Sequence, residues 1–303
     1  MAGIKLAIAP INWSNDDLHE LGGDVSLEQC LTEMQAAGFV GTEIGHKFPS
    51  SGQAIKSLLQ DYKLELASAW HSTFFLSSPF AVEQKRLEER LTVLAEAGAK
   101  RINFCECTGT VHGSIEVLLT QRPRMQKADW ALFSRALHQA AAICEQYGIT
   151  IAYHHHMGTV IQEEPEILQL LASTDPQHVG LCFDTGHLSF ANCDPLSFWS
   201  NVADRVQHIH LKDIRRPVHS KMWDKNSFLQ CVKEGVFTVP GDGGIDFAPL
   251  LREIVGHGYE GWLVVEAEQD PAVANPLVYA RTAYSYLNSI LSSTYEKRYA
   301  TAP

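Results

Sequence analysis

Eight short segments of strand character recur along the chain, and segments with helical spacing lie between them. The strand-like segments are rich in apolar or β-branched residues and cover residues 5–10, 40–45, 64–70, 101–106, 150–156, 179–184, 206–212 and 262–268. Between the first two, Leu27, Leu31 and Met34 fall on one face of a helix. Strands that alternate with helices build parallel sheets, so the pattern predicts an α/β protein.

Four of the predicted helices pass into the next strand through a glycine: Gly38, Gly98, Gly148 and Gly258. A helix that ends on a left-handed residue favours glycine there, because glycine has no Cβ to clash. Eight such strand–helix units predict a (β/α)8 TIM barrel, which we expect to form a single catalytic domain over residues 1–303. A doubly wound open sheet is the alternative, but no glycine-rich phosphate loop follows the first strand.

Composition narrows the functional classes. The chain has a formal charge of −11 with scattered Lys and Arg residues, which argues against nucleic acid as a partner. No apolar run approaches ~20 residues and the apolar start is too short for a signal segment, so we expect a cytoplasmic protein that does not enter a membrane. The seven cysteines are expected to be buried, reduced thiols. The oligomeric state stays open, and a homo-oligomer is common among soluble enzymes.

Side-chain alternation along the later strands separates an apolar face from a polar one. In segment 206–212, Ile209 and Leu211 form the apolar face, so His208, His210 and Lys212 are expected to point into the barrel. Segment 262–268 follows the same rule, with its two glutamates inside. Polar side chains should therefore gather inside the barrel at the carboxyl ends of these strands.

Four residues from successive strands stand at these carboxyl ends: His154, Asp184, His210 and Glu266. Barrels of this type carry their active sites at that end. Two imidazoles and two carboxylates make a mixed nitrogen and oxygen set that suits Mn²⁺, Co²⁺, Fe²⁺ or Zn²⁺. The alternative is that each is an interior polar residue satisfied by hydrogen bonds. Two long connections, residues 108–126 and 215–244, are expected to cover a substrate at the same end.

Several longer motifs resemble a known superfamily. They are INWSNDD at Ile11, GTEIGHKFP at Gly41, AYHHHMGT at Ala152, FDTGH at Phe183, HIHLKDIR at His208, FTVPGDGGIDF at Phe237 and VVEAEQDP at Val264. Read in order, they resemble the xylose isomerase-like, or sugar-phosphate isomerase-like, TIM-barrel superfamily over about residues 4–290. HHHMGT and FTVPGDG resemble the inosose dehydratases in particular.

The resemblance implies a metal site. Its ligands would be Asp184, His210 and Glu266, with His154 as the ligand on the fifth strand. The fifth strand departs from the wider pattern, because AYH stands where most members have Glu in strings such as AIE. Either His154 replaces that Glu, or His156 does, or the metal has fewer protein ligands. We favour Mn²⁺ or Co²⁺ as the cofactor, and Fe²⁺ or Zn²⁺ also suit this donor set.

The implied activity is that of a hydro-lyase acting on a small-molecule polyol ketone, 2-keto-myo-inositol, in myo-inositol catabolism. A cation would stabilise the developing oxygen charge as a Lewis acid. A base would remove the α-proton and a general acid would assist departure of the β-hydroxyl. Glu43, at the end of the second strand, is the first candidate for the base; the alternative is that His46 or Lys47 holds its carboxylate.

Four further side chains are candidates for the remaining roles. His71, His156 and His187 are candidate acids or substrate contacts, because imidazole titrates near neutral pH. Lys212 is a candidate hydrogen-bond donor to a substrate oxygen or a ligand carboxylate, and the alternative is a structural ion pair.

Three rival functions share parts of this pattern. A metal-dependent ketose or inosose isomerase or epimerase would use the same metal without loss of water. An abasic-site endonuclease shares the barrel, but it needs a basic groove that a charge of −11 does not favour. The third rival is a non-catalytic metal-binding protein.

Overall fold

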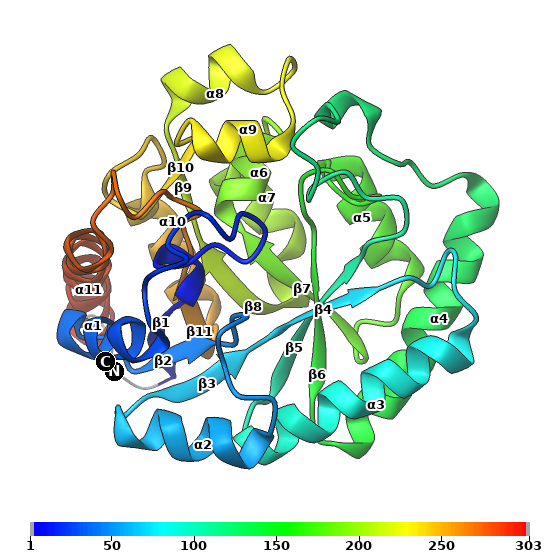
Figure 1. The fold of residues 1–303 in the computed structure, drawn as a ribbon, viewed down its shortest axis with the longest axis horizontal. Coiled ribbons are helices and arrows are strands. Elements are labelled where there is room, and N and C mark those ends of the chain that lie inside the picture. Colours follow the sequence, from blue (N-terminus) through cyan, green and yellow to red (C-terminus); the bar gives the residue numbers. More distant parts are fainter. Residues whose placement is uncertain (1–2, 301–303) are drawn as a thin grey trace.

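Nine parallel strands form the central sheet, and Figure 1 shows it with helices around it. The computed structural model describes residues 3–300, so residues 1–2 and 301–303 of the predicted domain lie outside the described range. The strands are β1 (Ile4–Ile8), β2 (Gly41–Glu43), β3 (Glu65–Ser68), β4 (Trp70–Thr73), β5 (Arg101–Glu106), β6 (Thr150–His154), β7 (Val179–Asp184), β8 (Val206–Leu211) and β11 (Gly261–Val265). Their hydrogen-bonded order is β3-β2-β1-β11-β8-β7-β6-β5-β4.

The two strands at the ends of this order are consecutive in the chain. Only Ala69 separates β3, which pairs with β2, from β4, which pairs with β5. The predicted third strand is therefore two short strands, and the chain itself closes the ring between them. The pairing of β2 with β3 also shifts between Thr42 and Glu43. The predicted TIM barrel is confirmed, with its third strand in two pieces.

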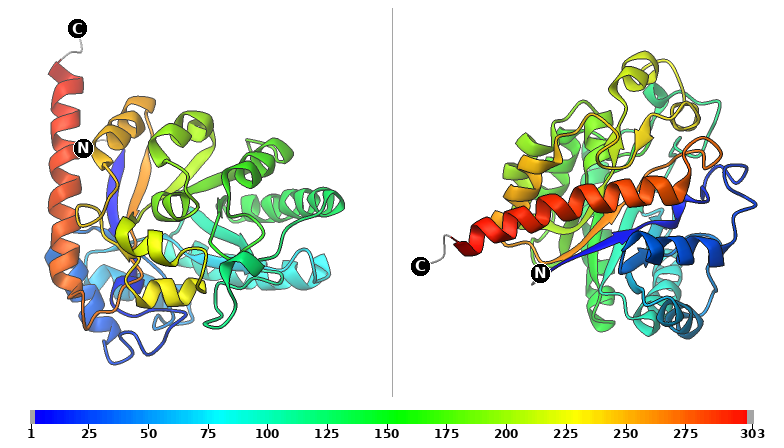
Figure 2. Two further views of the ribbon diagram at one scale, coloured as in Figure 1. Left: turned by 90° about the horizontal axis from the view of Figure 1, so that it is seen from above. Right: turned by 90° about the vertical axis from the view of Figure 1, so that its left-hand side faces the viewer.

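Helices surround the sheet, and Figure 2 shows the last and longest of them running along one side of the barrel. They are α1 (Leu27–Ala37), α2 (Gly52–Asp61), α3 (Phe80–Ala97), α4 (Lys127–Gln146), α5 (Glu164–Ser173), α6 (Thr185–Phe190), α7 (Pro195–Val202), α10 (Phe247–His257) and α11 (Pro276–Ala300). The junction glycines have left-handed backbones, with φ of 106° at Gly38 and 85° at Gly258. None of the helices in the described part of the chain has the length and apolarity to cross a bilayer.

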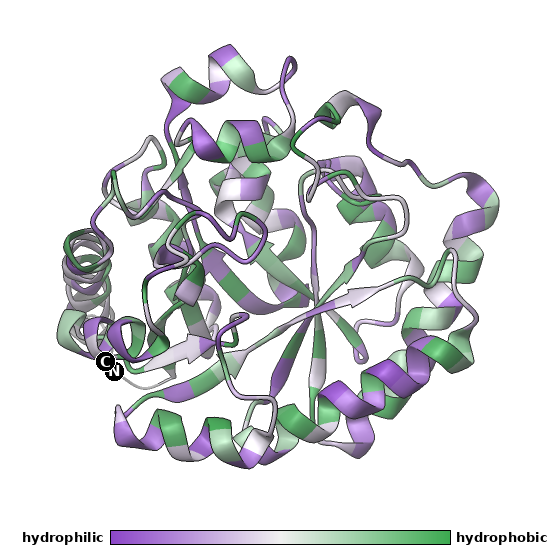
Figure 3. Cartoon of the chain, in the orientation of Figure 1, coloured by the Kyte–Doolittle hydropathy of each residue, from purple (hydrophilic) through white to green (hydrophobic). Residues whose placement is uncertain are grey.

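The main core lies between the sheet and the helices. Ile209 is fully buried on the outward face of its strand, as the alternation predicts, and Phe104 and Phe183 are fully buried in the same core. Figure 3 shows the outer helices carrying apolar and hydrophilic residues in alternation, as expected of helices that are buried on one face. Inside the barrel, small side chains including Ala7 and Ala67 form a separate apolar cluster.

A second apolar cluster covers part of the barrel mouth. The predicted long connection at 215–244 contains α8 (Arg216–Met222), α9 (Phe228–Lys233) and β10 (Phe237–Thr238), which pairs with β9 (Asp213–Ile214). Phe228 and Phe237 pack there with Leu18 and Leu21 from the loop after β1. Figure 1 shows that loop in front of the strand ends, below α9. The mouth is therefore built from segments far apart in the sequence.

The other long connection, residues 108–126, joins the same cover. It contains a short 3-10 helix, η2 (Leu119–Gln121), and two hydrogen bonds tie it to the start of α9. The Leu119 amide donates to the Asn226 carbonyl oxygen at 3.3 Å, and the Ser227 hydroxyl donates to the Ile115 carbonyl oxygen at 2.8 Å. Two further 3-10 turns are η1 (Pro10–Asn12) and η3 (Ala203–Arg205).

Candidate active site

Four predicted side chains converge at the carboxyl ends of the strands. His154 ends β6, Asp184 ends β7, His210 lies in β8 and Glu266 follows β11 directly. One donor atom from each of the four lies within 4.8 Å of the others. His154 Nε2 is 3.4 Å from Asp184 Oδ2, and His210 Nδ1 is 2.6 Å from Glu266 Oε2. The structure thus brings together the full set that strand alternation predicts.

The donor atoms of this set are poorly satisfied by the protein itself. Within residues 3–300, Asp184 Oδ2 and Glu266 Oε2 are buried without a partner in hydrogen-bond geometry, although His210 Nδ1 lies close to both oxygens. Buried polar atoms normally have partners, so this convergence needs an explanation. Two carboxylates and two imidazoles that direct lone pairs at one point fit a divalent cation.

Behind His210 lies a second polar layer. Glu43 Oε1 is 2.7 Å from His208 Nε2, 3.2 Å from His210 Nε2 and 3.0 Å from Asn103 Nδ2. Burial opposes the charge on Glu43, but the neighbouring His210 and the hydrogen bond from His208 outweigh it and hold the pKa of that carboxyl well below its usual range. When His210 Nε2 donates to Glu43, Nδ1 is the ring atom that can give up its proton and bind a cation beside Glu266.

Neither sequence neighbour holds Glu43. Lys47 Nζ donates instead to three backbone carbonyl oxygens in residues 22–25, and His46 pairs with Asp16. The partners of Glu43 come from β5 and β8, which do not pair with β2. Glu43 therefore lies where the sequence analysis placed it, but in an orienting network rather than in a local ion pair.

Lys212 is fully buried beside the same cluster. Its ammonium lies 2.9 Å from Glu266 Oε1 and 2.7 Å from Glu268 Oε1. Burial disfavours the charge, but the two carboxylates outweigh that cost and raise the pKa of Lys212 above its usual value. The Lys212 stem also explains the glycine of FDTGH, because a Cβ at Gly186 would come within 2.5 Å of Lys212 Cγ.

His156 and His187 form a ring pair next to the donor cluster. Their ring centroids are 4.0 Å apart, and a donor atom of each lies within 4.8 Å of a Glu268 oxygen. His187 belongs to the first turn of α6, which Asp184 caps by accepting the His187 amide at 2.8 Å through Oδ1. Asp184 thus uses one oxygen for the helix and turns the other toward His154.

His71 is not brought into the site. Its neighbours Trp70 and Ser72 line the pocket, so alternation along β4 turns His71 toward the helices. Its ring centroid lies 5.2 Å from that of Phe104 in the main core. Burial there lowers the pKa of His71 to about 3.

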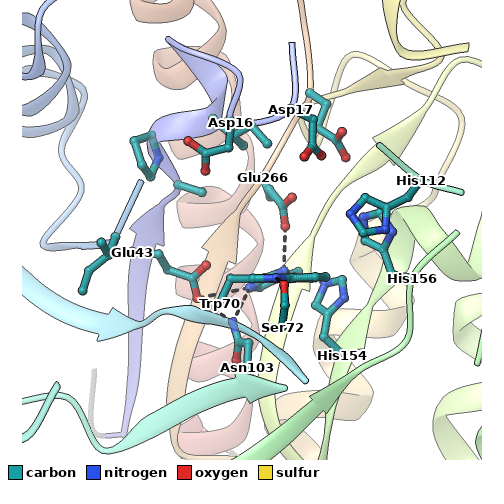
Figure 4. A pocket seen from close by; sticks show the side chains of 16 residues that line it. Asp16, Asp17, Glu43, Trp70, Ser72, Asn103, His112, His154, His156 and Glu266 are labelled. Atoms are coloured by element: carbon teal, nitrogen blue, oxygen red, sulfur yellow. Dashed lines mark hydrogen bonds and ion pairs between the residues drawn. The ribbon is translucent and has the colours of Figure 1, made fainter. Parts of the chain in front are cut away.

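A pocket of about 320 Å³ opens above the cluster (Figure 4). His154, His210 and Glu266 lie in its floor, and Figure 4 shows Asp16 and Asp17 on the opposite side from His154. None of the described residues that line it is Lys or Arg. Some lining residues were not predicted from the sequence: Asp16, Asp17, Ser72, Asn103 and His112. The first two lie in the quoted INWSNDD motif, which was a signal for them, whereas His112 lies in a long loop without one.

Comparisons with known proteins agree with this architecture. A family model described as a xylose isomerase-like TIM barrel matches residues 31–290. Over 286 residues the chain is 46% identical to the inosose dehydratase of Geobacillus thermodenitrificans, covering 94% of this chain and 96% of that protein. The chain belongs to the inosose dehydratase family of xylose isomerase-like TIM barrels. Family membership makes it an enzyme of the hydro-lyase class.

Two further similarities extend the comparison. The rhizopine catabolism protein MocC of Rhizobium meliloti is 41% identical over 288 residues, covering 95% of this chain and 88% of that protein. Among solved structures, the IOLI protein with a bound zinc atom aligns with a TM-score of 0.70 and 13% identity, covering 96% of this chain and 99% of that one. The second similarity concerns the fold alone.

Proposed function

We propose that this inosose dehydratase relative removes water from 2-keto-myo-inositol in a reaction that depends on a divalent metal ion. The observation that carries the proposal is the convergence of His154, Asp184, His210 and Glu266 at the floor of the pocket. The substrate is taken from the relatives that match along nearly the whole chain, which are inosose dehydratases. The pocket supports an uncharged substrate, because its described lining offers carboxylates and imidazoles rather than Lys or Arg for an anion.

The four converging residues would hold the metal ion. Mn²⁺ or Co²⁺ is our first choice, with Fe²⁺ or Zn²⁺ also suited to the donor set, and the IOLI protein, which shares this fold, has a bound zinc atom. Bound there, the cation would polarise the ketone carbonyl as a Lewis acid and so acidify the neighbouring C–H bond. His154, rather than His156, is the fifth-strand residue whose donor atom lies in this set.

The surrounding residues divide into positioning groups and proton-transfer candidates. Glu43 orients His210 through its Nε2 atom, and Lys212 holds Oε1 of Glu266 so that Oε2 faces the cluster. His156 lines the pocket and is placed to exchange protons with substrate hydroxyls, whereas His187 is buried behind it in ring contact. Glu43 accepts hydrogen bonds on Oε1 only in the described structure, so its Oε2 stays a candidate for the base.

The deciding experiment is incubation of metal-reconstituted protein with 2-keto-myo-inositol. We expect a product lighter by one water molecule, with the ultraviolet absorbance of an enolised dione. Chelation should abolish this product, and addition of Mn²⁺, Co²⁺, Fe²⁺ or Zn²⁺ in turn should identify the native metal. A product of unchanged mass would replace dehydration by isomerisation or epimerisation. Unchanged ketone with every metal would overturn the proposal.

The cellular setting is a further part of the proposal. All seven cysteines are free thiols, and six of them are buried. Proteins that keep free thiols are typical of reducing compartments, which supports a cytoplasmic location.

A further inference from the structure

The His112 imidazole reaches the pocket from a long loop rather than from the end of a strand. His112 lies in the 108–126 connection, where Thr110 Oγ1 is 2.7 Å from His112 Nδ1 and 3.0 Å from the Gly158 carbonyl oxygen. A carbonyl oxygen can only accept, so the single hydroxyl hydrogen of Thr110 goes to Gly158. His112 Nδ1 must then donate to Thr110, which leaves a lone pair on His112 Nε2. Burial lowers the pKa of His112, so the ring is neutral near pH 7.

The loop is held tightly at this point. Gly158 has a left-handed backbone with φ of 80°, and a Cβ there would lie 2.8 Å from the His112 amide nitrogen. The Gly158 carbonyl oxygen also accepts the Val111 amide at 3.0 Å. The glycine of HHHMGT therefore permits the close approach that delivers His112 to the pocket.

His156 has the same arrangement of protons. Its Nδ1 atom is 2.8 Å from the Met157 carbonyl oxygen, which can only accept. Nδ1 of His156 therefore carries the hydrogen and Nε2 carries the lone pair. The two rings are neighbours, with centroids 5.0 Å apart and planes at 65° (Figure 4).

Both Nε2 atoms open into the pocket. Within the described residues 3–300, neither Nε2 atom has a hydrogen-bond partner. Neither atom is fully buried, so both are accessible from the pocket. Both residues line the pocket, so their free ring edges reach its space. Two acceptors with no internal donor therefore face the volume that a substrate would occupy.

We propose that His112 and His156 form an acceptor pair, whose Nε2 atoms accept hydrogen bonds from hydroxyl groups of the substrate. Thr110 is the positioning residue for His112. The proposal rests on the proposed function, since it assigns how the polyol ketone is recognised. Adjacent ring hydroxyls offer two O–H hydrogens to such a pair. A carboxylate or phosphate offers none, and it would also face Asp16, Asp17 and Glu268 in the same lining.

The proton positions can be measured without any activity. In metal-loaded protein labelled with ¹⁵N-histidine, we expect both rings to show a protonated Nδ1 and a bare Nε2, assigned with His112→Phe and His156→Phe. Thr110→Val removes the acceptor of the His112 Nδ1 hydrogen, so the hydrogen should no longer be fixed on Nδ1. Thr110→Ser keeps the hydroxyl and should keep the hydrogen on Nδ1. An Nε2–H tautomer or an imidazolium at His112 in the unaltered protein would overturn the proposal.

The contact between His112 and a substrate hydroxyl is tested by changing each partner in turn: the histidine by mutation, and the hydroxyl by use of monodeoxy substrates. Leaving one buried hydrogen-bonding group without its partner costs roughly 10- to 100-fold in kcat/KM. We expect the unaltered enzyme to prefer 2-keto-myo-inositol over one of its monodeoxy analogues by that factor. His112→Phe should lose this preference for that analogue while it keeps the preference over the others. His138→Phe, on the outer helix α4, is the control and should keep them all.

Each outcome decides one of the two claims. A His112→Phe variant that retains every preference shows that the ring reads no hydroxyl. If that variant does not fold, the same comparison of Thr110→Val with Thr110→Ser replaces it. If the unaltered enzyme does not dehydrate the ketone, the proposed function fails separately. The acceptor pair is then tested by ligand binding alone. It is supported if 2-keto-myo-inositol shifts the His112 Nε2 resonance and at least one monodeoxy analogue does not. It is overturned if every analogue shifts that resonance equally or if none of the ligands shifts it.

Discussion

The floor and the wall of the pocket are built in different ways. His154, Asp184 and His210 stand at sheet positions whose neighbours are set by strand pairing, as in the alignment of Asp184 with His210 between β7 and β8. Asp17 and His112 stand on loops that are positioned by contacts between distant segments. The floor therefore has one geometry that the barrel imposes. The wall has a geometry that depends on a few hydrogen bonds and can vary while the barrel is kept.

The largest effect is expected from Asp184→Asn in the floor. This change keeps the oxygen that caps α6 and removes the charge that faces His154. We expect elemental analysis to find no stoichiometric metal and the dehydration rate to fall to background, with the circular dichroism spectrum unchanged. His210→Ala should also lose the metal. Stoichiometric metal in both variants would refute the site and remove the distinction between floor and wall.

The second effect concerns the stability of the floor. Lys212→Met leaves Glu266 and Glu268 buried without their ammonium partner, which should cost about 3–5 kcal/mol in the free energy of unfolding. Urea denaturation with chelator present measures it. Lys5→Met, which breaks the exposed pair with Glu65, is the control and should cost no more than about 1 kcal/mol. Equal costs in the two variants would contradict the ion-pair role of Lys212.

Glu43→Gln separates orientation from proton abstraction. If Glu43 orients His210, metal affinity and activity should fall together by roughly 10- to 100-fold, as for other residues that support a ligand. Titration of the chelated protein with Mn²⁺ measures the affinity. Unchanged metal affinity with lost turnover would instead make Glu43 the base that the sequence analysis suggested.

The smallest effect on activity is expected behind the wall, at His71. Its folded pKa of about 3 lies below the 6.5 of an exposed histidine, so the fold favours the neutral ring. This contribution is complete above pH 6.5 and is lost as the pH falls from 6.5 to below 3, by up to about 5 kcal/mol. His71→Phe should flatten that part of the stability profile and leave dehydration unchanged. A large loss of turnover in folded His71→Phe would return His71 to the site.

The sequence predicted the floor because strand alternation has a period of two and needs no distant contact. Ile209 and Leu211 pack outward as expected, which leaves His210 inside. The same rule gave no guide to His71, because the expected third strand stopped at Trp70 whereas the structure continues as β4 to Thr73.

The loop residues of the pocket wall could not be predicted from strand alternation, because tertiary contacts position them. His112 reaches the pocket because Thr110 bonds to Gly158, a contact between segments 48 residues apart that no local pattern records. Glu43 was compared with its neighbours His46 and Lys47, but its partners His208 and Asn103 come from other strands. Residues whose positions depend on such tertiary contacts need the structure.

At Ala69 the barrel is closed by the chain itself. Because β3 pairs with β2 and β4 pairs with β5, one stretch of backbone joins the two ends of the strand order. New chain termini placed between Ser68 and Trp70 would leave all these strand pairings in place. Such a circular permutant would turn a closed ring into a curled open sheet, with Trp70 at the free edge beside the pocket.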